Sequence, residues 1–119
     1  MDVILRKAEP SDMKAVLSLI RELAAFENEP GAVEITEKQL REDGFGPSPY
    51  FEVIVAETQG TVVGMALFYY RFSTWKGRTI HLEDLIVKED YRNKGFGSKL
   101  YTEVLRLAHG KGLKRVEWN

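Results

Sequence analysis

Residues 82–98 read LEDLIVKEDYRNKGFGS, and this stretch decides the fold of the chain. The apolar, β-rich run that ends at Val87 predicts a strand, the basic segment after it predicts a turn, and the residues from Gly97 onward predict a helix. Glycine lets the backbone approach a ligand, and the first amides of a helix lack intrahelical acceptors at the positive end of its dipole. Such a turn suits a pyrophosphate, with Arg92 and Lys94 adding positive charge.

Two well-known phosphate loops do not fit this turn. It has no Gly-Lys-Ser/Thr after four spacer residues, so it is not a nucleotide P-loop. It has one Gly-x-Gly rather than the three glycines of the dinucleotide fingerprint. A lone Gly-x-Gly after a strand is as readily a plain tight turn before a helix, so the rest of the chain must support the assignment.

The remaining sequence predicts an α/β fold, a mixed sheet with helices on its faces, in the order β-α-α-β-β-β-α-β. Strands are expected at residues 3–6, 51–57, 62–72, 79–87 and 114–118, and helices at 12–26, 37–43 and 97–109. Ser11 is expected to cap the first helix, Thr36 and Gln39 match a capping box for the second, and Gly64 suggests a bulge. Three strands joined by short turns predict an antiparallel meander, and a strand after a helix is expected to lie parallel.

Composition narrows the function classes. The 119 residues fit one domain, and 44% hydrophobic with 29% charged residues is typical of a globular chain. The net charge of -1 argues against general electrostatic binding of nucleic acid, which requires a basic surface. Without cysteine and with two separated histidines, no disulfide, metal site or thiol nucleophile is expected. No apolar run has membrane-span length and no leader pattern is present, so we expect a cytoplasmic protein without a membrane partner.

Several blocks of the chain resemble one known family. Arg92-x-x-Gly95-x-Gly97 after Val87 looks like the acetyl-CoA loop of the GCN5-related N-acetyltransferases, the GNAT family. Residues 19–24 (LIRELA), 42–46 (EDGFG), 73–78 (STWKGR) and 82–84 (LED) resemble its diamine (spermidine/spermine) and thialysine N-acetyltransferase subfamily, in the family's order. The resemblance implies a GNAT fold and transfer of an acetyl group from acetyl-CoA to the primary amine of a small cationic acceptor. The amine would attack directly, without a covalent enzyme intermediate.

The resemblance also implies where the ligands bind. Acetyl-CoA would lie in a splay between the strand at 79–87 and the last strand, with its pantetheine arm on strand backbone and its pyrophosphate on the amides of residues 93–98. A strand amide would stabilise the oxyanion. The implied cofactor-binding residues are Leu85, Ile86, Val87, Arg92, Asn93, Lys94, Gly95, Phe96, Gly97 and Ser98. The implied acceptor-binding residues are Phe26, Glu27, Trp75 and Glu83.

Glu83 is the implied catalytic residue, and its chemistry is suitable. An alkyl ammonium is attracted by carboxylates and must lose a proton before it attacks. Glu83 could accept that proton, directly or through water. Asp84 is expected to face the opposite side because strand side chains alternate. Without the resemblance, Glu83 and Asp84 would be surface acids, and Glu27 an acid at a helix end.

The chain departs from the family pattern at three places. The family continues past the last strand with a Phe-Tyr pair, whose tyrosine is the usual general acid, and this chain stops at Asn119 before it. We therefore expect one GNAT domain over residues 1–119 that is incomplete at its C-terminus, and a non-catalytic CoA-binding or structural remnant stays open as an alternative. Polyamine-selective members carry an acid where Ser73 stands, which favours a thialysine-like or other short amine. His81 stands where close relatives have an aromatic residue.

The family commonly forms homodimers with acceptor sites near the interface, so a dimer is expected.

Overall fold

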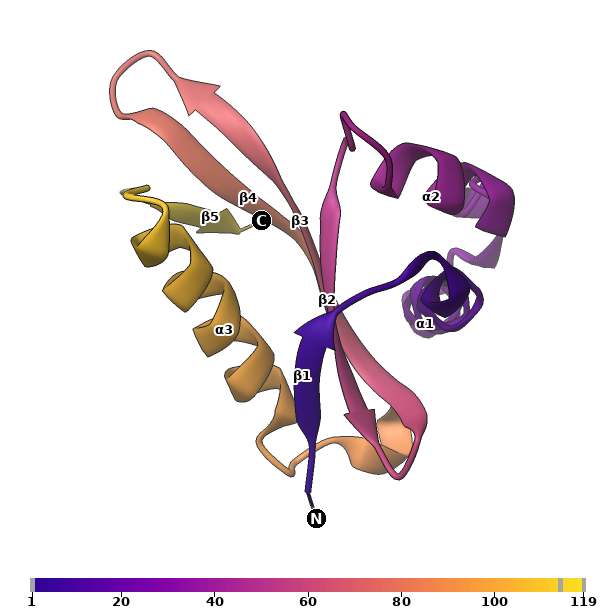
Figure 1. The fold of residues 1–119 in the computed structure, drawn as a ribbon. Helices are drawn as coiled ribbons and strands as arrows, with labels where there is room; N and C mark the ends of the chain where they lie inside the picture. The colour runs from indigo at the N-terminus through magenta and orange to yellow at the C-terminus, as the bar shows by residue number, and fades with distance from the viewer. Residues whose placement is uncertain (1, 114, 119) are drawn as a thin grey trace.

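Five strands form one mixed sheet in the order β1-β2-β3-β4-β5 (Figure 1). The computed structural model describes residues 2–113 and 115–118. The elements are β1 (Ile4–Lys7), η1 (Pro10–Asp12), α1 (Met13–Phe26), η2 (Pro30–Ala32), α2 (Glu37–Gly44), β2 (Glu52–Thr58), β3 (Thr61–Ser73), β4 (Gly77–Val87), η3 (Glu89–Tyr91), α3 (Phe96–Gly110) and β5 (Val116–Trp118). Lys114, where the last strand was expected to begin, lies outside the described residues.

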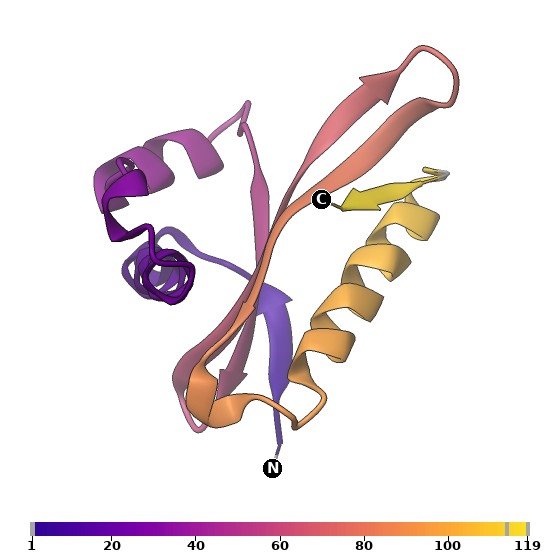
Figure 2. The ribbon, with the colours of Figure 1, turned by 180° about the vertical axis from the view of Figure 1, so that it is seen from behind.

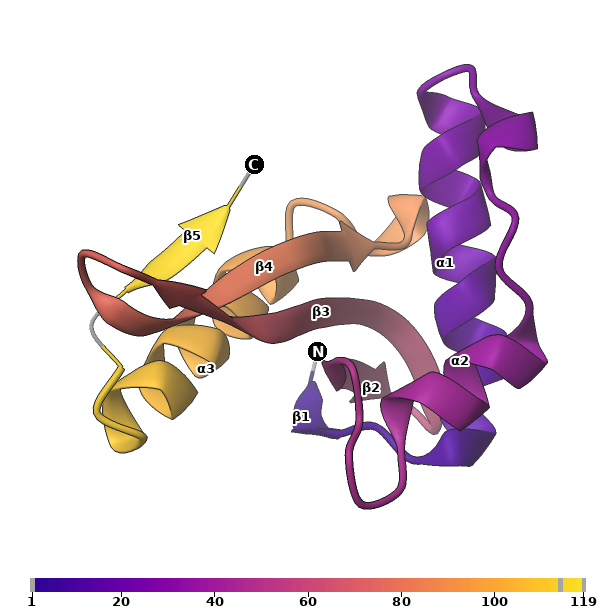
Figure 3. The same cartoon turned by 90° about the horizontal axis from the view of Figure 1, so that it is seen from above.

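The expected topology is confirmed. β1, β2, β3 and β4 pair antiparallel in sequence order, and β5 pairs parallel to β4 after the crossover through α3. α1 and α2 lie against one face of the sheet and α3 against the other, as Figures 1 and 2 show from opposite sides. The view from above separates the same layers (Figure 3), and Figure 1 shows the turn of the β3–β4 hairpin projecting past the end of α3.

Two apolar clusters hold these layers together. α1 buries Met13, Val16, Leu17 and Leu19 against the face of the sheet that carries Val55, Met65 and Ile86. α3 buries Leu100, Val104 and Ala108 against the face that carries Ile54, Phe68 and Leu82. Both helical sets recur at the three- and four-residue spacing that the sequence shows. Full burial of each large side chain contributes roughly 1.5–3 kcal/mol, so the two clusters fix the helices on the sheet.

Two strands each carry one extra residue. Between β2 and β3 the register passes from Ala56↔Gly64 to Glu57↔Val62, so Val63 is the additional residue beside the glycine that suggested a bulge. Between β3 and β4 the register passes from Leu67↔Asp84 to Phe68↔Leu82. Glu83 is the additional residue of β4, and nothing in the sequence predicted a bulge there.

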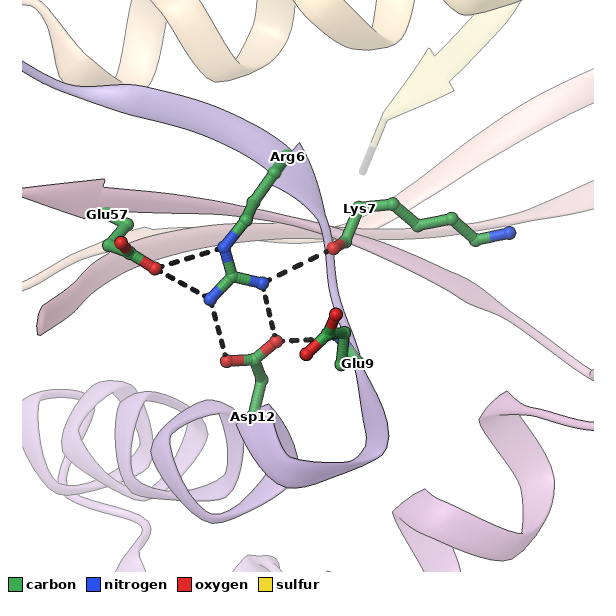
Figure 4. Close-up of polar contacts among 5 residues, drawn as sticks. All are labelled: Arg6, Lys7, Glu9, Asp12 and Glu57. Atoms are coloured by element: carbon green, nitrogen blue, oxygen red, sulfur yellow. Dashed lines mark hydrogen bonds and ion pairs between the residues drawn. The ribbon is translucent and has the colours of Figure 1, made fainter. Parts of the chain in front are cut away.

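Arg6 ties β1 to β2 and to the start of α1 (Figure 4). Its guanidinium donates to both Asp12 carboxylate oxygens at 2.8 and 3.0 Å and to Glu57 Oε1 at 2.7 and 3.0 Å. The Asp12 carboxylate also accepts the Glu9 amide at 2.7 Å and so caps η1. Ser11 was therefore the wrong cap, because η1 precedes α1 and Asp12 is the N-cap residue of α1, although its carboxylate bonds the start of η1 and no amide of α1. At α2 the expected capping box is present, since Thr36 Oγ1 accepts the Gln39 amide at 3.1 Å.

Replacing Arg6 by Met should destabilise the fold in a pH-dependent way. Hydrogen bonds from Arg6 hold the pKa of Asp12 below its usual value, so this stabilisation is present above that value and is lost as the pH falls through the lowered pKa. We expect Arg6→Met to reduce the free energy of unfolding by about 1–3 kcal/mol at pH 7. The difference should shrink below about pH 4 in urea titrations. Lys7→Met, the exposed neighbour on the same strand, is the matched control, and a difference that does not change with pH would contradict this account.

Candidate functional site

The bulge at Glu83 brings two carboxylates to one side of the sheet. Leu67, the register partner of Asp84, belongs to the cluster under α1, whereas Leu82 belongs to the cluster under α3. Glu83 is exposed and Asp84 half-buried, and both line one pocket of about 270 Å³. The other lining residues are Ile20, Ile35, Gln39, Leu40, Asp43, Phe51 and Leu67. The expectation that Asp84 faces away from Glu83 was therefore wrong, because the extra residue interrupts the alternation.

Glu27 adds a third negative charge to this region. It is the C-cap residue of α1 and is exposed to solvent. Burial raises the pKa of Asp84 above its usual value, and the neighbouring charges of Glu83 and Glu27 raise it further. Gathering these carboxylates costs electrostatic free energy, and a cation placed among them would recover part of that cost. The pocket combines apolar walls with an acidic mouth, which suits an alkyl ammonium.

Tyr69 also contacts the acids and was not identified from the sequence. Its hydroxyl donates to Glu83 Oε1 at 3.4 Å across the β3–β4 pair. Burial and the charge of Glu83 raise the pKa of this phenol. The sequence carried no signal for the contact, because Tyr69 lies within an aromatic run and the bulge that aims Glu83 toward it is not encoded by a glycine or a proline.

Most of the cofactor-binding candidates meet at the start of α3. A second pocket of about 270 Å³ lies at this helix start. Its lining residues are Val87, Tyr91, Arg92, Asn93, Gly95, Phe96, Gly97 and Ser98. Gly95 is the N-cap residue with φ of 81°, and Asn93 has φ of 63°, so the chain turns sharply here before the helix begins. The first amides of α3 lack intrahelical acceptors, and the pocket therefore offers N–H donors to an anion.

Arg92 is directed toward α1 as well as toward this pocket. Its Nε donates to the Val87 carbonyl at 3.0 Å, and its Nη2 lies 3.8 Å from Glu22 Oε1 on α1. The same carboxylate oxygen accepts the backbone amide of Glu89 at 3.2 Å. The Arg92 guanidinium also lies 5.7 Å from the ring centroid of Phe26. Arg92 therefore joins the loop to the last turn of α1, in addition to any positive charge it brings to an anion.

The remaining candidates are distributed along the sheet. Leu85 and Val87 pack toward α3 and Ile86 toward α1, so all three stand on β4 between the acidic pocket and the loop pocket. Lys94 is exposed in the loop and does not line the pocket. Among the described residues, β5 pairs with β4 at Ile80–Leu82 and not with the stretch from Glu83 to Val87, where the splay was expected.

The two aromatic acceptor candidates lie in different places. Phe26 is the last residue of α1 and is 72% exposed beside Arg92. Trp75 is 94% exposed in the turn of the β3–β4 hairpin, far from α1 (Figure 1). β4 begins at Gly77, and the six steps along the strand from Gly77 to Glu83 correspond to roughly 20 Å. Within one chain the structure brings Glu27 and Glu83 close enough for both charges to act on Asp84, places Phe26 beside Arg92, and leaves Trp75 in the hairpin turn.

The described part of the chain shows neither a metal centre nor a membrane segment. No group of three or more His, Asp or Glu side chains within residues 2–113 and 115–118 could hold a metal ion. Over the same residues, no helix is both long enough and apolar enough to cross a bilayer.

Comparison with known proteins identifies relatives along nearly the whole chain. The profile of the Acetyltransferase (GNAT) family matches residues 15–119. The chain is 43% identical over 130 residues to thialysine N-epsilon-acetyltransferase of Bos taurus, covering 98% of this chain and 76% of the bovine protein. It is 35% identical over 111 residues to spermidine/spermine N(1)-acetyltransferase-like protein 1 of Homo sapiens, covering 87% of this chain and 16% of that protein.

Solved structures share the fold. An aminoglycoside acetyltransferase from an uncultured soil metagenomic sample, solved with trehalose, superposes with a TM-score of 0.80 at 20% identity, covering 98% of this chain and 76% of that one. An acetyltransferase of Trypanosoma brucei superposes with a TM-score of 0.74 at 25% identity, covering 99% and 82%. The mixed sheet with α1 and α2 on one face and α3 on the other is therefore the arrangement these enzymes have.

Replacing Asp84 by Asn should stabilise the protein near neutral pH. The raised pKa means that the ionised carboxylate is less favourable in the folded chain than in the unfolded one, so the penalty is present at pH 7 and disappears as Asp84 becomes protonated at acid pH. We expect Asp84→Asn to raise Tm by about 2–4 °C at pH 7 and to give no gain at pH 3. The gain at pH 7 is small because the carboxyl of Asp84 is partly solvated. Asp43→Asn, an exposed acid of the same pocket, is the control, and a lower Tm for Asp84→Asn at pH 7 would contradict the argument.

Proposed function

Because the chain belongs to the GNAT acetyltransferase family and is an N-acetyltransferase, we propose that it moves an acetyl group from acetyl-CoA to the primary amine of a small cationic acceptor. The acceptor class is a thialysine-like amino acid or a di- or polyamine. The observation that carries the proposal is the convergence of Glu27, Glu83 and Asp84 beside an apolar pocket, one strand away from a loop that presents helix N-terminal amides.

The loop at the start of α3 fits the pyrophosphate of acetyl-CoA. Its free amides belong to the first turn of α3, and Gly97 lines the pocket without a side chain. A Cβ built on Gly97 lies 3.9 Å from Val87 Cγ2, an ordinary van der Waals distance, so the fold itself has room for it. Acetyl-CoA would supply the activated acetyl group as a thioester, with backbone groups of Leu85, Ile86 and Val87 along its pantetheine arm.

The acids have distinct tasks in this proposal. Glu27 and Asp84 attract the acceptor's ammonium group, and the exposed ring of Phe26 packs beside its alkyl chain. Glu83 accepts the ammonium proton, so that the neutral nitrogen can attack the acetyl carbonyl directly. A β4 amide donates to the carbonyl oxygen as negative charge develops there. Attack forms the N–C bond of a tetrahedral intermediate, whose collapse breaks the C–S bond. The remaining excess proton of the nitrogen leaves with the sulfur, giving the CoA thiol, or passes to water when CoA leaves as the thiolate.

A homodimer in the cytoplasm completes the proposal. The exposure of Trp75 at the hairpin tip, distant from Glu83 of its own chain, supports an acceptor site near an interface between two copies. The acidic mouth supports a small cationic partner rather than nucleic acid or an anionic membrane surface. Light scattering at micromolar concentration should give twice the mass of one chain, and a monomer would contradict the dimer.

Calorimetric titration with acetyl-CoA tests the cofactor assignment first, because it does not require the acceptor to be known. We expect one-site binding by the unmodified chain and at least a tenfold loss of affinity for Gly97→Val, because the branched side chain projects into the space for the pyrophosphate. Gly110→Val, at the other end of α3 with no atom within 4 Å of its Cβ, is the matched control. Equal affinity for Gly97→Val would overturn the pyrophosphate placement, and no binding by the folded chain would overturn the use of acetyl-CoA.

Release of CoA in the presence of thialysine, spermidine or a short diamine tests the acid assignment. We expect Glu83→Gln to lower kcat by about 10²–10⁴-fold while the Kd for acetyl-CoA stays unchanged, because a carboxamide cannot accept the ammonium proton. Glu29→Gln, an exposed acid beyond the end of α1, should behave like the unmodified protein. An unchanged kcat for Glu83→Gln would remove Glu83 from the reaction, and the relative rates of the three amines identify the acceptor class.

A further inference from the structure

A buried histidine stands beside the proposed proton acceptor. His81 is 3% exposed on β4, two residues before Glu83, and is the register partner of Tyr69 on β3. The two rings lie 5.1 Å apart at 36°. His81 Nε2 lies 3.6 Å from Glu83 Oε1, the same oxygen that accepts the Tyr69 hydroxyl at 3.4 Å. Nothing in the proposed reaction so far uses this imidazole.

Arg71 determines which nitrogen of His81 carries the proton. Arg71 Nη1 lies 3.2 Å from His81 Nδ1. A guanidinium only donates hydrogen bonds, so Nδ1 must be the accepting nitrogen of a neutral ring. The hydrogen of neutral His81 is then on Nε2, the nitrogen that faces Glu83. The tautomer follows from the chemistry of Arg71 rather than from an observed hydrogen.

From this geometry we propose that His81 is a positioning residue for Glu83: Arg71 fixes its tautomer, and its Nε2–H orients the Glu83 carboxylate for proton acceptance. The proposal rests on the proposed function, in which Glu83 takes the proton of the acceptor amine. At 3.6 Å the contact is longer than a direct hydrogen bond, so the proposal requires the exposed Glu83 side chain to rotate toward His81. With two donors on Oε1, the other oxygen is left to meet the ammonium.

The same contacts exclude His81 as the next carrier of that proton. Its Nε2 already holds a hydrogen, and the lone pair of Nδ1 faces the permanently charged Arg71. In this tautomer neither ring nitrogen offers Glu83 a free lone pair, so the proposed role of His81 is to orient Glu83 and not to carry its proton. In the proposed reaction Glu83 contacts the acceptor nitrogen, whereas His81 contacts only Glu83. A variant of His81 should therefore lose activity only when Glu83 is present.

Two substitutions at His81 separate the polar role from the packing role. His81→Phe keeps an aromatic ring against Tyr69 but has no N–H, whereas His81→Gln supplies both an N–H donor and an oxygen acceptor. We expect His81→Phe to lower kcat about ten- to a hundredfold with an unchanged Kd for acetyl-CoA, and His81→Gln to recover most of the loss. Thr79→Val is the matched control, since Thr79 is buried on the same strand and bonds Glu117 at 3.1 Å.

The double variant distinguishes positioning from general stabilisation. In the Glu83→Gln background, His81→Phe should cost no further activity, because the carboxylate it orients has gone. Additive losses, or a His81→Phe enzyme as fast as the unmodified one, would overturn the proposal. If the unmodified chain neither binds acetyl-CoA nor releases CoA, the proposed function has failed and this inference fails with it. Normal activity of the unmodified chain with an insensitive His81 would overturn this inference alone.

Nitrogen-15 NMR tests the tautomer without any turnover. The chain has two histidines, His81 and His109, so His109→Gln assigns the ring signals. We expect the Nε2–H tautomer for His81 at pH 7.5, and Arg71→Met should change the ring shifts because Nδ1 loses its donor. A His81 ring with its hydrogen on Nδ1, or one insensitive to Arg71→Met, would overturn the proposal even if the enzyme is active.

Discussion

The bulge in β4 is the constraint on which the site depends. One extra residue lets Leu82 and Leu85 both face α3, where they pack in the same cluster, while Glu83 and Asp84 between them both reach the pocket under α1 and α2. In a regular strand one of these acids would point into the core beneath α3, where an unpaired charge costs several kcal/mol. The register change therefore lets β4 keep an apolar face toward α3 while both adjacent carboxylates lie on the opposite face of the sheet.

Much of the fold could be predicted because local signals agree with the tertiary arrangement. Leu100, Val104 and Ala108 recur at helical spacing and are buried in the helix where that spacing placed them. The capping box at Thr36 is a contact over three residues, so sequence alone contains all of it. Ser11 was misassigned because η1 delays the start of α1, and the side chain that closes this turn is held by Arg6 from another strand.

The site could be predicted less completely, and the missing parts share one cause. The loop from Arg92 to Ser98 is continuous in sequence, so its residues could be grouped as cofactor-binding candidates, and the structure brings most of them to one pocket. The position of Asp84, the contact of Tyr69 with Glu83 and the link from Glu22 to Arg92 depend on register or on packing between distant elements. A strand pattern carries no information about which residue is the extra one, and a helix pattern does not show which loop lies across its last turn.

The link between α1 and the loop has a thermodynamic consequence. Arg92 lines the loop pocket, bonds the carbonyl that ends β4, and lies 3.8 Å from Glu22 Oε1 and 5.7 Å from the ring centroid of Phe26, so one side chain joins the loop to the end of α1 that carries Glu27. Binding free energies at two linked sites are reciprocal: by whatever factor occupancy of the loop strengthens binding of an amine, occupancy by the amine strengthens binding at the loop. In the proposed complex with both ligands, Arg92 is the side chain through which the two sites would be coupled, and the coupling free energy can be measured from the binding of either ligand.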